Sequence, residues 1–521
     1  MPATDVARPA HSHTEIEAKL RVDPLFAMPD LRDLPGVAGV VAMPDAVLHA
    51  TYFDTPDLTL LAAGITLRHR REPEAPAGSP GTWTLKLPGQ AGGLALQRSE
   101  LTWEEPAGAI PAEAISLTRA RVRRAVLGPV AELQTRRQRF ALMGADGLPA
   151  AELDDDVVTV HGGPGDGRVF REIEVEITDS STTRTLEAAV ERLQAAGASA
   201  EQSGTKLGRA LGAPPAGRRA NSPVRLGPRS TVGEAVRMCL GDGLRTLIAH
   251  DIGIRLGGDV EHVHQARVAA RRLRSELRLF RPELEPDWER RLSDGLKRLG
   301  QALGAVRDTD VMVAGLQDAL AELELADGAA AGSLLNRLVR ERTAAVARLR
   351  AEMDGEAYLD LLDALSSAAL APELVRDEGA EVHDVLPALM RRQWKRMRAQ
   401  AGSLPEVPRD EALHELRKRA KHLRYAAERA APALRGTTAK RAAKLGRRAE
   451  DLQDVLGRLH DAGVREEWLR AQKRLKEGAS LAAGELIAAA VEERQRAREV
   501  WQEPWDDARK AWRKFTKASS G

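Results

Sequence analysis

The sequence contains a single cysteine, Cys239, in 521 residues. One cysteine excludes a disulfide framework and a cysteine-based zinc site within one chain, and it fits a reducing compartment. Aromatic residues make up only 3% of the chain, which argues against a protein that stacks the bases of single-stranded nucleic acid. The first 14 residues lack the apolar stretch of a secretory signal, and no run of 18 apolar residues occurs. These absences predict a cytoplasmic protein that has no membrane partner.

The length of the chain predicts the number of domains, and its charge is balanced overall. A chain of 521 residues is too long for one ordinary hydrophobic core, so we expect two or three domains. The formal net charge is only +2, because 78 basic residues offset 76 acidic ones. This near-neutral total hides strong local bias, so the arrangement of charge along the chain is more informative than its sum.

A short run near the N-terminus alternates charged and aliphatic residues. In Glu15–Leu20, a β-strand places Glu15, Glu17 and Lys19 on one face. Two carboxylates and an ammonium side by side are costly unless they have partners. A divalent cation on the carboxylates and a phosphate near the lysine would supply these partners. Taken alone, however, the run is better explained by a solvated strand face.

Segment after segment up to residue 211 carries charge on one strand face and aliphatic residues on the other. On an open sheet the charged face would be solvated. In a closed antiparallel barrel the apolar face packs outward against helices, and the charged face lines a tunnel. Such a lining suits an oligophosphate bound with a divalent metal, because bases hold phosphate oxygens and acids hold the ion. The candidate acids are Glu15, Glu17, Glu172, Glu174 and Glu176, and the candidate bases are Lys19, Arg68, Arg70, Lys86, Arg98, Arg137 and Lys206.

The motifs of this region, in this order, resemble those of the CYTH family, the triphosphate tunnel metalloenzymes. The resemblance covers the whole first domain, expected at residues 11–211, and implies a closed antiparallel β-barrel tunnel with flanking helices. The family includes inorganic triphosphatases, thiamine triphosphatases, adenylyl cyclases and RNA triphosphatases. The resemblance rests on the E-x-E-x-K run, the turn at Tyr52–Thr55, the strands containing Leu67–Arg70 and Thr84–Lys86, the E-I-E-V-E strand at 172–176 and Lys206.

The resemblance also implies roles for these residues. The metal would be Mg²⁺ or Mn²⁺, held by Glu15, Glu17 and acids among Glu172, Glu174 and Glu176; which of these last three are ligands stays open. A metal-activated water would attack the terminal phosphorus in line, while cations neutralise the developing charge. Glu15, Glu17 and Lys19 would form the catalytic set, and the triphosphate would be held by Lys19, Arg68, Arg70, Lys86, Arg137 and Lys206.

Two points qualify the match. The family usually has serine immediately before the late lysine, where this chain has Thr205, and a hydroxyl is therefore kept. Arg98, Glu100 and the acidic run Glu152–Asp156 are weaker candidates for the lining. For most of that acidic run we expect a role as surface charge.

A change in composition separates this region from the rest of the chain. Residues 212–229 are rich in Pro, Gly, Arg and Ser without periodicity and predict an interdomain linker. From residue 230 to 515, apolar residues recur at spacings of three and four, which predicts an all-helical domain.

The helical region contains an internal repeat. Val263–Arg274 aligns with Leu413–Arg424, and each segment presents a histidine and three cations within an arc of about 80° on one helix face. A second shared element, Leu299–Val311, corresponds to Leu452–Asp461; its aspartates we assign to orienting arginines or capping helices rather than to a metal. The repeat predicts a bundle with two-fold pseudo-symmetry, whose two stripes face a common groove. The stripe residues are His264, Arg267, Arg271, Arg274, His414, Arg417, Lys421 and Arg424.

A basic helix face is more often simply solvated. Two stripes in identical register argue against that interpretation, because like charges packed so densely repel and an extended polyanion is their natural counterion. A bound polyphosphate would also raise the pKa of the histidines. The arrangement resembles the CHAD family, the conserved-histidine α-helical domains, over about residues 230–515. That resemblance implies binding of inorganic polyphosphate and makes polyphosphate granules a candidate location.

Together the two regions predict a metal-dependent hydrolase that cleaves inorganic triphosphate or short polyphosphate in the tunnel, while the helical domain holds long chains. The alternatives left open are a polyphosphate-binding, granule-targeting protein without catalysis, and a tunnel enzyme that acts on thiamine triphosphate or ATP. Nucleic-acid binding by the helical domain ranks lower, because no base-reading module is evident and aromatic residues are few.

Overall fold

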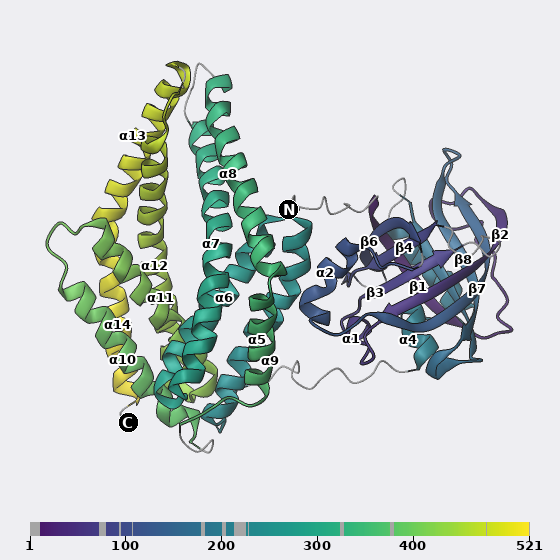
Figure 1. Ribbon diagram of the computed structural model, residues 1–521, viewed down its shortest axis with the longest axis horizontal. Helices are drawn as coiled ribbons and strands as arrows, with labels where there is room; N and C mark the ends of the chain where they lie inside the picture. Colours follow the sequence, from purple (N-terminus) through teal and green to yellow (C-terminus); the bar gives the residue numbers. More distant parts are fainter. Residues whose placement is uncertain are drawn as a thin grey trace. The chain divides into compact units, whose positions relative to one another are not determined.

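A computed structural model describes residues 11–71, 80–92, 95–106, 108–178, 183–200, 205–212, 226–227, 229–322, 328–375, 380–475 and 477–519. The chain forms two compact units, Met1–Arg219 and Ala220–Gly521 (Figure 1). The division falls within the predicted linker, residues 212–229. Residues 213–225 and 228 of that segment lie outside the described residues, so its exact bounds stay a prediction.

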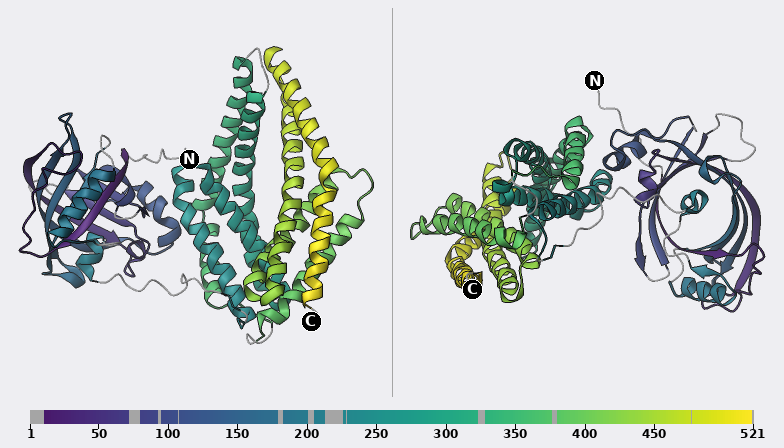
Figure 2. Two further views of the ribbon diagram at one scale, coloured as in Figure 1. Left: turned by 180° about the vertical axis from the view of Figure 1, so that it is seen from behind. Right: turned by 90° about the horizontal axis from the view of Figure 1, so that it is seen from below.

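The first unit contains a closed antiparallel barrel, as the sequence predicts. Eight strands close in the order β1-β9-β8-β7-β2-β3-β4-β6, and β6 returns to β1. Closure occurs at β1, which pairs with β6 over His11–Glu17 and with β9 over Glu17–Val22. Figure 2 (right) shows the ring of strands along its axis. The strands are β1 (His11–Val22), β2 (Gly39–Asp54), β3 (Thr66–Arg71), β4 (Pro80–Lys86), β5 (Gln90–Gly92), β6 (Ala95–Pro106), β7 (Gly128–Met143), β8 (Pro149–His161), β9 (Val169–Ile177) and β10 (Ser199–Ala200).

The aliphatic face of the alternating strands lies outside the barrel. Ala18 and Leu20 of β1 and Ile173 and Val175 of β9 are buried in one cluster with α3 (Thr183–Ala195). That cluster includes the helix residues Leu186, Ala189, Val190 and Leu193. Because successive side chains on a strand point to opposite faces, covering the aliphatic face turns the charged face into the barrel. The inward placement of the charged face is therefore confirmed.

A short final helix supplies an apolar wall inside the barrel. Leu207 and Ala210 of α4 (Lys206–Leu211) are buried with Leu133 of β7 and with Val158 and Val160 of β8. The helix begins after Thr205, whose hydroxyl accepts a hydrogen bond from the Gly208 amide at 3.0 Å. The threonine hydroxyl thus caps the helix, and Lys206 becomes its first residue.

The aspartate of the Tyr52–Thr55 turn has a structural role. Its buried carboxylate accepts backbone N–H groups from Thr55, Leu60 and Leu61 at 2.7 to 2.9 Å. These bonds order α1 (Thr59–Ala62), which has no side-chain cap from its N-cap residue. A further helix, α2 (Ala112–Val122), and a 3₁₀ turn, η1 (Gly163–Gly165), complete the described part of this unit.

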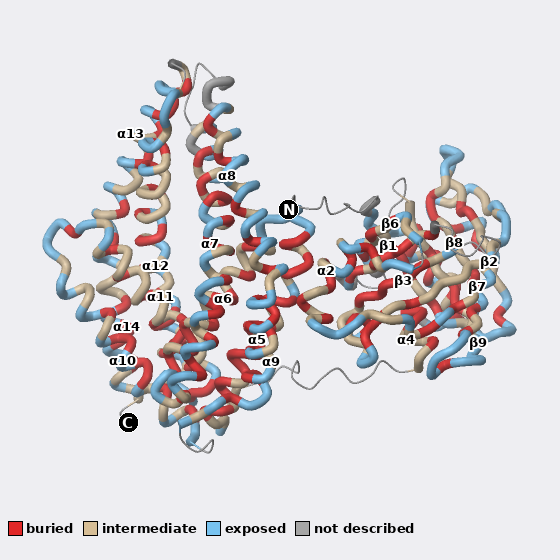
Figure 3. Tube along the Cα trace, viewed as in Figure 1, coloured by how far each residue is buried: buried red, intermediate tan, exposed pale blue. Residues whose placement is uncertain are grey.

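The described part of the second unit is built from helices, as predicted. Helices α6 and α11 pack against each other and carry the two basic stripes. Buried and exposed positions alternate along these helices, as their amphipathic pattern requires (Figure 3). The two-fold relation between the halves stays a prediction. The elements are α5 (Val232–Leu256), α6 (Val260–Phe280), η3 (Arg281–Glu283), α7 (Pro286–Glu322), α8 (Gly328–Asp354), α9 (Glu356–Leu370), α10 (Val382–Gly402), α11 (Asp410–Ala433), α12 (Gly436–Ala471), α13 (Glu477–Val500) and α14 (Gln502–Ser519).

Among the described residues, none of the helices combines the length and the apolar character needed to cross a bilayer.

Candidate functional site

The barrel encloses a cavity of about 200 Å³ with a strongly charged wall. Acidic and basic side chains are equal in number, seven of each, so the way they pair decides what the cavity can bind. All the predicted tunnel residues except Glu172 line it. The lining consists of Glu15, Glu17, Lys19, Tyr52, Thr66, Arg68, Arg70, Lys86, Arg98, Glu100, Arg137, Glu152, Asp154, Glu174, Glu176, Thr205 and Lys206.

Glu174 is the centre of a buried network of ion pairs. Its carboxylate accepts from Lys19, from Arg137 at 3.1 Å and from Lys206 at 2.9 Å. Burial by itself raises the pKa of Glu174, but the three cations outweigh it and hold that pKa well below the usual range. Conversely, burial lowers the pKa of Lys19 and Lys206, and the surrounding carboxylates raise both above the ordinary lysine value.

Asp156 reinforces this network from the neighbouring strand. Arg137 binds it in bidentate fashion at 2.8 and 2.7 Å, and Lys206 reaches it at 2.6 Å. Glu172 lies beside it in the sheet register and contacts Lys206 at 3.1 Å and Arg209 at 2.6 Å. Of the three acids on β9, Glu172 and Glu174 are therefore already held by cations.

A second group of acids lies on the first half of β1 and on the two strands that pair with it, β6 and β9. Lys86 is shared between Glu15 at 2.6 Å and Glu100 at 2.8 Å. Burial, and then the charge of Glu15, raises the pKa of Glu176 to about 7. Burial raises the pKa of Glu17, but Lys19 and Lys86 outweigh that effect and hold it below its usual value. These carboxylates repel one another, and a cation between them would relieve the repulsion.

Two arginines on β3 make no close ion pair with a described residue. Burial lowers the pKa of Arg68, but Tyr52, Glu100 and Glu174 outweigh burial and raise that pKa. Within the part of the chain that the structure describes, neither Arg68 nor Arg70 has a carboxylate within 4.0 Å, and the buried Nε of each has no hydrogen-bond partner. Repulsion from Arg68, followed by burial and Arg137, lowers the pKa of Arg70 to about 10. Buried guanidinium groups without counterions favour an anion, and the tetrahedral oxygens of phosphate match their geometry.

The acidic side chains of the cavity are of a chemical type that binds divalent cations. Carboxylate oxygens are the ligands that Mg²⁺ and Mn²⁺ prefer, and one oxygen of Glu17, Oε1, is buried without a hydrogen-bond partner. The Arg98 Nε lies 4.0 Å from this oxygen. Over the described ranges, no group of three or more Asp, Glu, His or Cys side chains is already arranged about a common point. A metal held by Glu15, Glu17 and Glu176 therefore requires Lys19 and Lys86 to release their carboxylates.

The acidic run on β8 was assigned wrongly. We expected mostly surface charge over Glu152–Asp156, yet Asp154 lines the cavity, Asp156 is completely buried, and Asp155 is buried in a bidentate pair with Arg171. A signal was present, because Asp154 and Asp156 alternate like the neighbouring R-x-R strand. Only the register, which sets Asp156 opposite Arg137, shows that they point inward. Arg98 and Glu100, ranked as weaker candidates, also line the cavity.

Cations of the two helical stripes lie close enough to act on one another, while a common groove stays a prediction. Burial, and then Arg271, Arg417, Arg267 and Arg274, lowers the pKa of Lys421 to about 7, so cations from both α6 and α11 act on one amine. Burial and Arg417 likewise lower the pKa of Arg271. This concentration of like charge favours a bound anion.

The shared element on α7 and α12 orients two of the stripe arginines. Arg267 pairs with Asp308 at 3.0 Å, and Arg417 lies 4.0 Å from Asp461. The glycine one turn before each aspartate leaves room for the guanidinium. A Cβ on Gly457 would lie 3.3 Å from the Arg417 Nη2. The orienting role expected for these aspartates is thus confirmed, and Asp310 also pairs with an arginine, Arg342, at 2.6 Å.

Burial and neighbouring cationic or titratable groups lower the pKa of both stripe histidines. Burial and Arg307 lower the pKa of His264, and burial and His460 lower the pKa of His414 to about 4. The His414 and His460 rings lie in contact, with centroids 4.2 Å apart and planes tilted by 37°. His414 also borders a cavity of about 660 Å³ whose wall includes Glu415 and Glu466, so its surroundings are partly acidic. The stripe residue Arg424 is neutralised by Glu428 and Glu450, each at 2.8 Å.

Comparison with known proteins finds relatives of most of the chain and solved structures that are similar to parts of it. Two uncharacterized proteins, one from each of two strains of Mycobacterium tuberculosis, are each 31% identical over 494 residues, covering 90% of this chain and 90% of theirs. The structure of the CHAD domain from the plant Ricinus communis is 21% identical and covers 56% of this chain and 95% of that chain, with a TM-score of 0.46. A Hippeastrum protein proposed as an adenylyl cyclase, in which a triphosphatase activity dominates, is 17% identical and covers 38% of this chain and 94% of that chain, with a TM-score of 0.23.

Family comparison assigns each region separately. Residues 13–211 match the CYTH domain family, and residues 239–470 match the CHAD domain family. These ranges contain the charged barrel and the two basic stripes respectively. The chain therefore belongs to the family of proteins in which a CYTH triphosphate tunnel domain is followed by a CHAD domain.

Proposed function

We propose that the barrel hydrolyses inorganic triphosphate or a short polyphosphate with Mg²⁺ or Mn²⁺. The observation that carries the proposal is the uneven pairing of charge inside the cavity. No described carboxylate lies within 4.0 Å of Arg68 or Arg70, whereas Glu15, Glu17 and Glu176 repel one another. A phosphate chain on the arginines and a cation on the acids would complete both sets.

The remaining bases would hold the phosphate chain after an exchange of partners. Lys19, Lys86, Arg137 and Lys206 all point into the cavity while bound to carboxylates. Phosphate oxygens would replace part of those contacts, which frees Glu15 and Glu17 to bind the metal. Bound there, Mg²⁺ or Mn²⁺ supplies Lewis acidity that activates water and neutralises charge. The bases then stabilise the negative charge that develops on the phosphoryl oxygens.

We propose that the helical unit binds long inorganic polyphosphate along the two stripes. Cations from α6 and α11 act on Lys421 together, which supports a shared groove for an extended anion. A two-fold repeat would give both halves the same role, and polyphosphate granules would be a fitting location. Because Arg424 is held by Glu428 and Glu450, we expect stripe cations without such acids, Arg271 and Lys421 among them, to contribute more to binding.

The first test is phosphate release from tripolyphosphate, with Mg²⁺ or Mn²⁺ compared with a chelator. Wild type should release phosphate only with metal, and the double variant Glu15→Gln/Glu17→Gln should lose that release. A matched control is Glu132→Gln, which changes an exposed glutamate on β7 and should leave the rate unchanged. Wild-type release no faster than that of the double variant would overturn the proposal and favour binding without catalysis, or an organic triphosphate as the substrate.

A further inference from the structure

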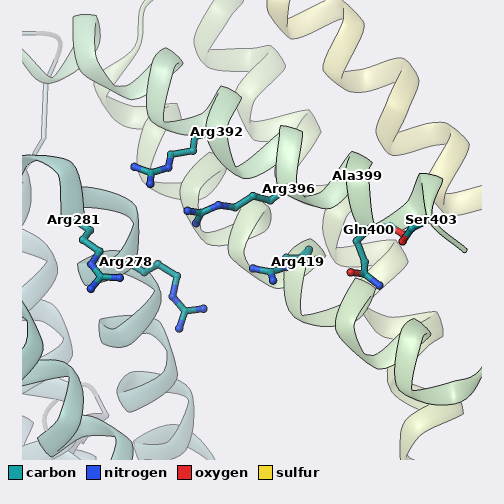
Figure 4. Close-up of a pocket in the computed structure, with 8 residues that line it drawn as sticks. All are labelled: Arg278, Arg281, Arg392, Arg396, Ala399, Gln400, Ser403 and Arg419. Atoms are coloured by element: carbon teal, nitrogen blue, oxygen red, sulfur yellow. The ribbon is translucent and has the colours of Figure 1, made fainter.

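The helical unit contains a second cationic cavity that the stripes do not include. It has a volume of about 710 Å³ and lies among α6, η3, α10 and α11. Figure 4 shows guanidinium groups from α10 and α11 pointing toward those of Arg278 and Arg281. Its wall consists of Arg278, Arg281, Arg392, Arg396, Ala399, Gln400, Ser403 and Arg419; we call it the arginine pocket.

The arginine pocket is short of acids. Among the described residues, Arg281 is the member of the group with an ion pair, to Glu289 at 3.2 Å. The Nη1 of Arg278 lies 3.1 Å from the Nε2 of His422, which is a histidine and not a carboxylate. Burial, and then Arg392 and Arg419, lowers the pKa of Arg396, so these guanidinium groups repel one another across the space. Such a cluster gains from an anion that contacts several of its members together.

Other clustered arginines in this unit are neutralised by protein carboxylates. Arg429 pairs with the buried Glu276 and with Asp242 at 3.3 Å. Arg272 pairs with Glu428 at 3.0 Å. Carboxylates thus hold these arginines in place, whereas among the described members of the arginine pocket an ion pair is found at Arg281, with Glu289.

The pocket lies on a different side of α11 from the stripe. Arg419 follows the stripe residue Arg417 by two positions, which rotates it by about 200° around the helix axis. A ligand in the pocket therefore contacts a face of α11 that the proposed polyphosphate groove does not use. Arg392 and Arg396 come from α10, which carries none of the stripe residues.

We propose that the arginine pocket binds a compact anion that carries several phosphate groups, a site additional to the tunnel and the stripe groove. Its volume is within the range of small-molecule pockets. Its planar guanidinium groups suit bidentate contacts to phosphate, and Gln400 and Ser403 add neutral polar groups at one end. The barrel cavity is smaller, at about 200 Å³, so we expect the two sites to select ligands of different size.

Titration calorimetry of the full chain with myo-inositol hexakisphosphate tests the proposal. Arg392→Gln/Arg396→Gln should weaken this binding about tenfold or more, because charge-assisted contacts to two guanidinium groups are lost. The matched control Arg391→Gln/Arg398→Gln removes the same charge from exposed positions of α10 outside the pocket. It should change the affinity by no more than about twofold.

Two further variants and a second anion distinguish the arginine pocket from the proposed polyphosphate groove and from unspecific anion binding. Ala399→Glu places a carboxylate at an exposed position of the pocket wall and should weaken binding as the double variant does. Arg271→Gln/Lys421→Met should lower the affinity for long-chain polyphosphate. The same variant should leave the affinity for myo-inositol hexakisphosphate unchanged. The proposal is overturned if the pocket and control pairs behave alike, if Ala399→Glu has no effect, or if citrate binds as tightly as the phosphate probe.

Discussion

Glu174→Gln should destabilise the barrel unless an anion takes the place of the lost carboxylate. The side chain is 12% exposed and accepts from three bases, so the substitution leaves Lys19, Arg137 and Lys206 with reduced compensation. Removing one partner of a buried ion pair costs about 3–5 kcal/mol. Here Asp156 still holds two of the bases and Glu17 still holds Lys19 at 3.1 Å, so we expect about 2–4 kcal/mol.

For a unit of this size, each kcal/mol shifts the melting temperature by about 2–4 °C, so Glu174→Gln should lower that of the barrel by about 4–16 °C. Calorimetric melting of the full chain can measure this shift, with Glu187→Gln on the exposed side of α3 as the control. Tripolyphosphate without metal should restore more stability to the variant than to wild type, because its oxygens replace the missing carboxylate. This account of the network is refuted if the variant has the melting temperature of wild type. It is also refuted if tripolyphosphate raises the melting temperature of the variant no more than that of wild type.

Three further predictions follow from the pKa shifts and the helix packing. Because the pKa of Glu176 is raised to about 7, its protonated form favours folding, and this contribution is lost as pH rises from about 4.5 to 7. A carboxylate must lose its proton before it can bind Mg²⁺, so the Mg²⁺ affinity of wild type, measured by calorimetry, should increase from pH 6 to pH 8. This pH dependence should largely disappear in Glu176→Gln. At pH 8, polyphosphate binding should take up close to one proton at Lys421, detected by calorimetry in buffers of different ionisation enthalpy and absent in Lys421→Met. Gly457→Ala should displace Arg417 and weaken polyphosphate binding severalfold, whereas Gly300→Ala, with open space around its Cβ, should leave binding unchanged and stabilise the helix by about 1 kcal/mol.

Much of the barrel site was predictable because strand geometry is local. Alternation in Glu15–Leu20 and in the E-I-E-V-E strand places acids on one face and aliphatic residues on the other, and the helix α3 covers the aliphatic face. The in-phase histidine stripes of the helical region followed equally from the periodicity of 3.6 residues. These patterns also carried the family resemblance.

Which acidic side chain pairs with which basic one could not be predicted in the same way. Asp156 looked like surface charge until the register placed it opposite Arg137 and Glu172, residues that lie 19 and 16 positions away. Whether a base is neutralised or free depends on such cross-strand neighbours. The arginine pocket shows the same limit, because its wall combines side chains of α6, α10 and α11 that no single periodic pattern contains.

The sequence by itself therefore determined which side chains share a face of each strand or helix, since that depends on the backbone repeat alone. Only the tertiary structure decided which charges are compensated and which stand free, because that depends on distances between segments far apart in the chain. Within the described residues Arg68 and Arg70 form no close ion pair, whereas Arg137 does. The cationic groups of the arginine pocket come together only when three helices pack against one another.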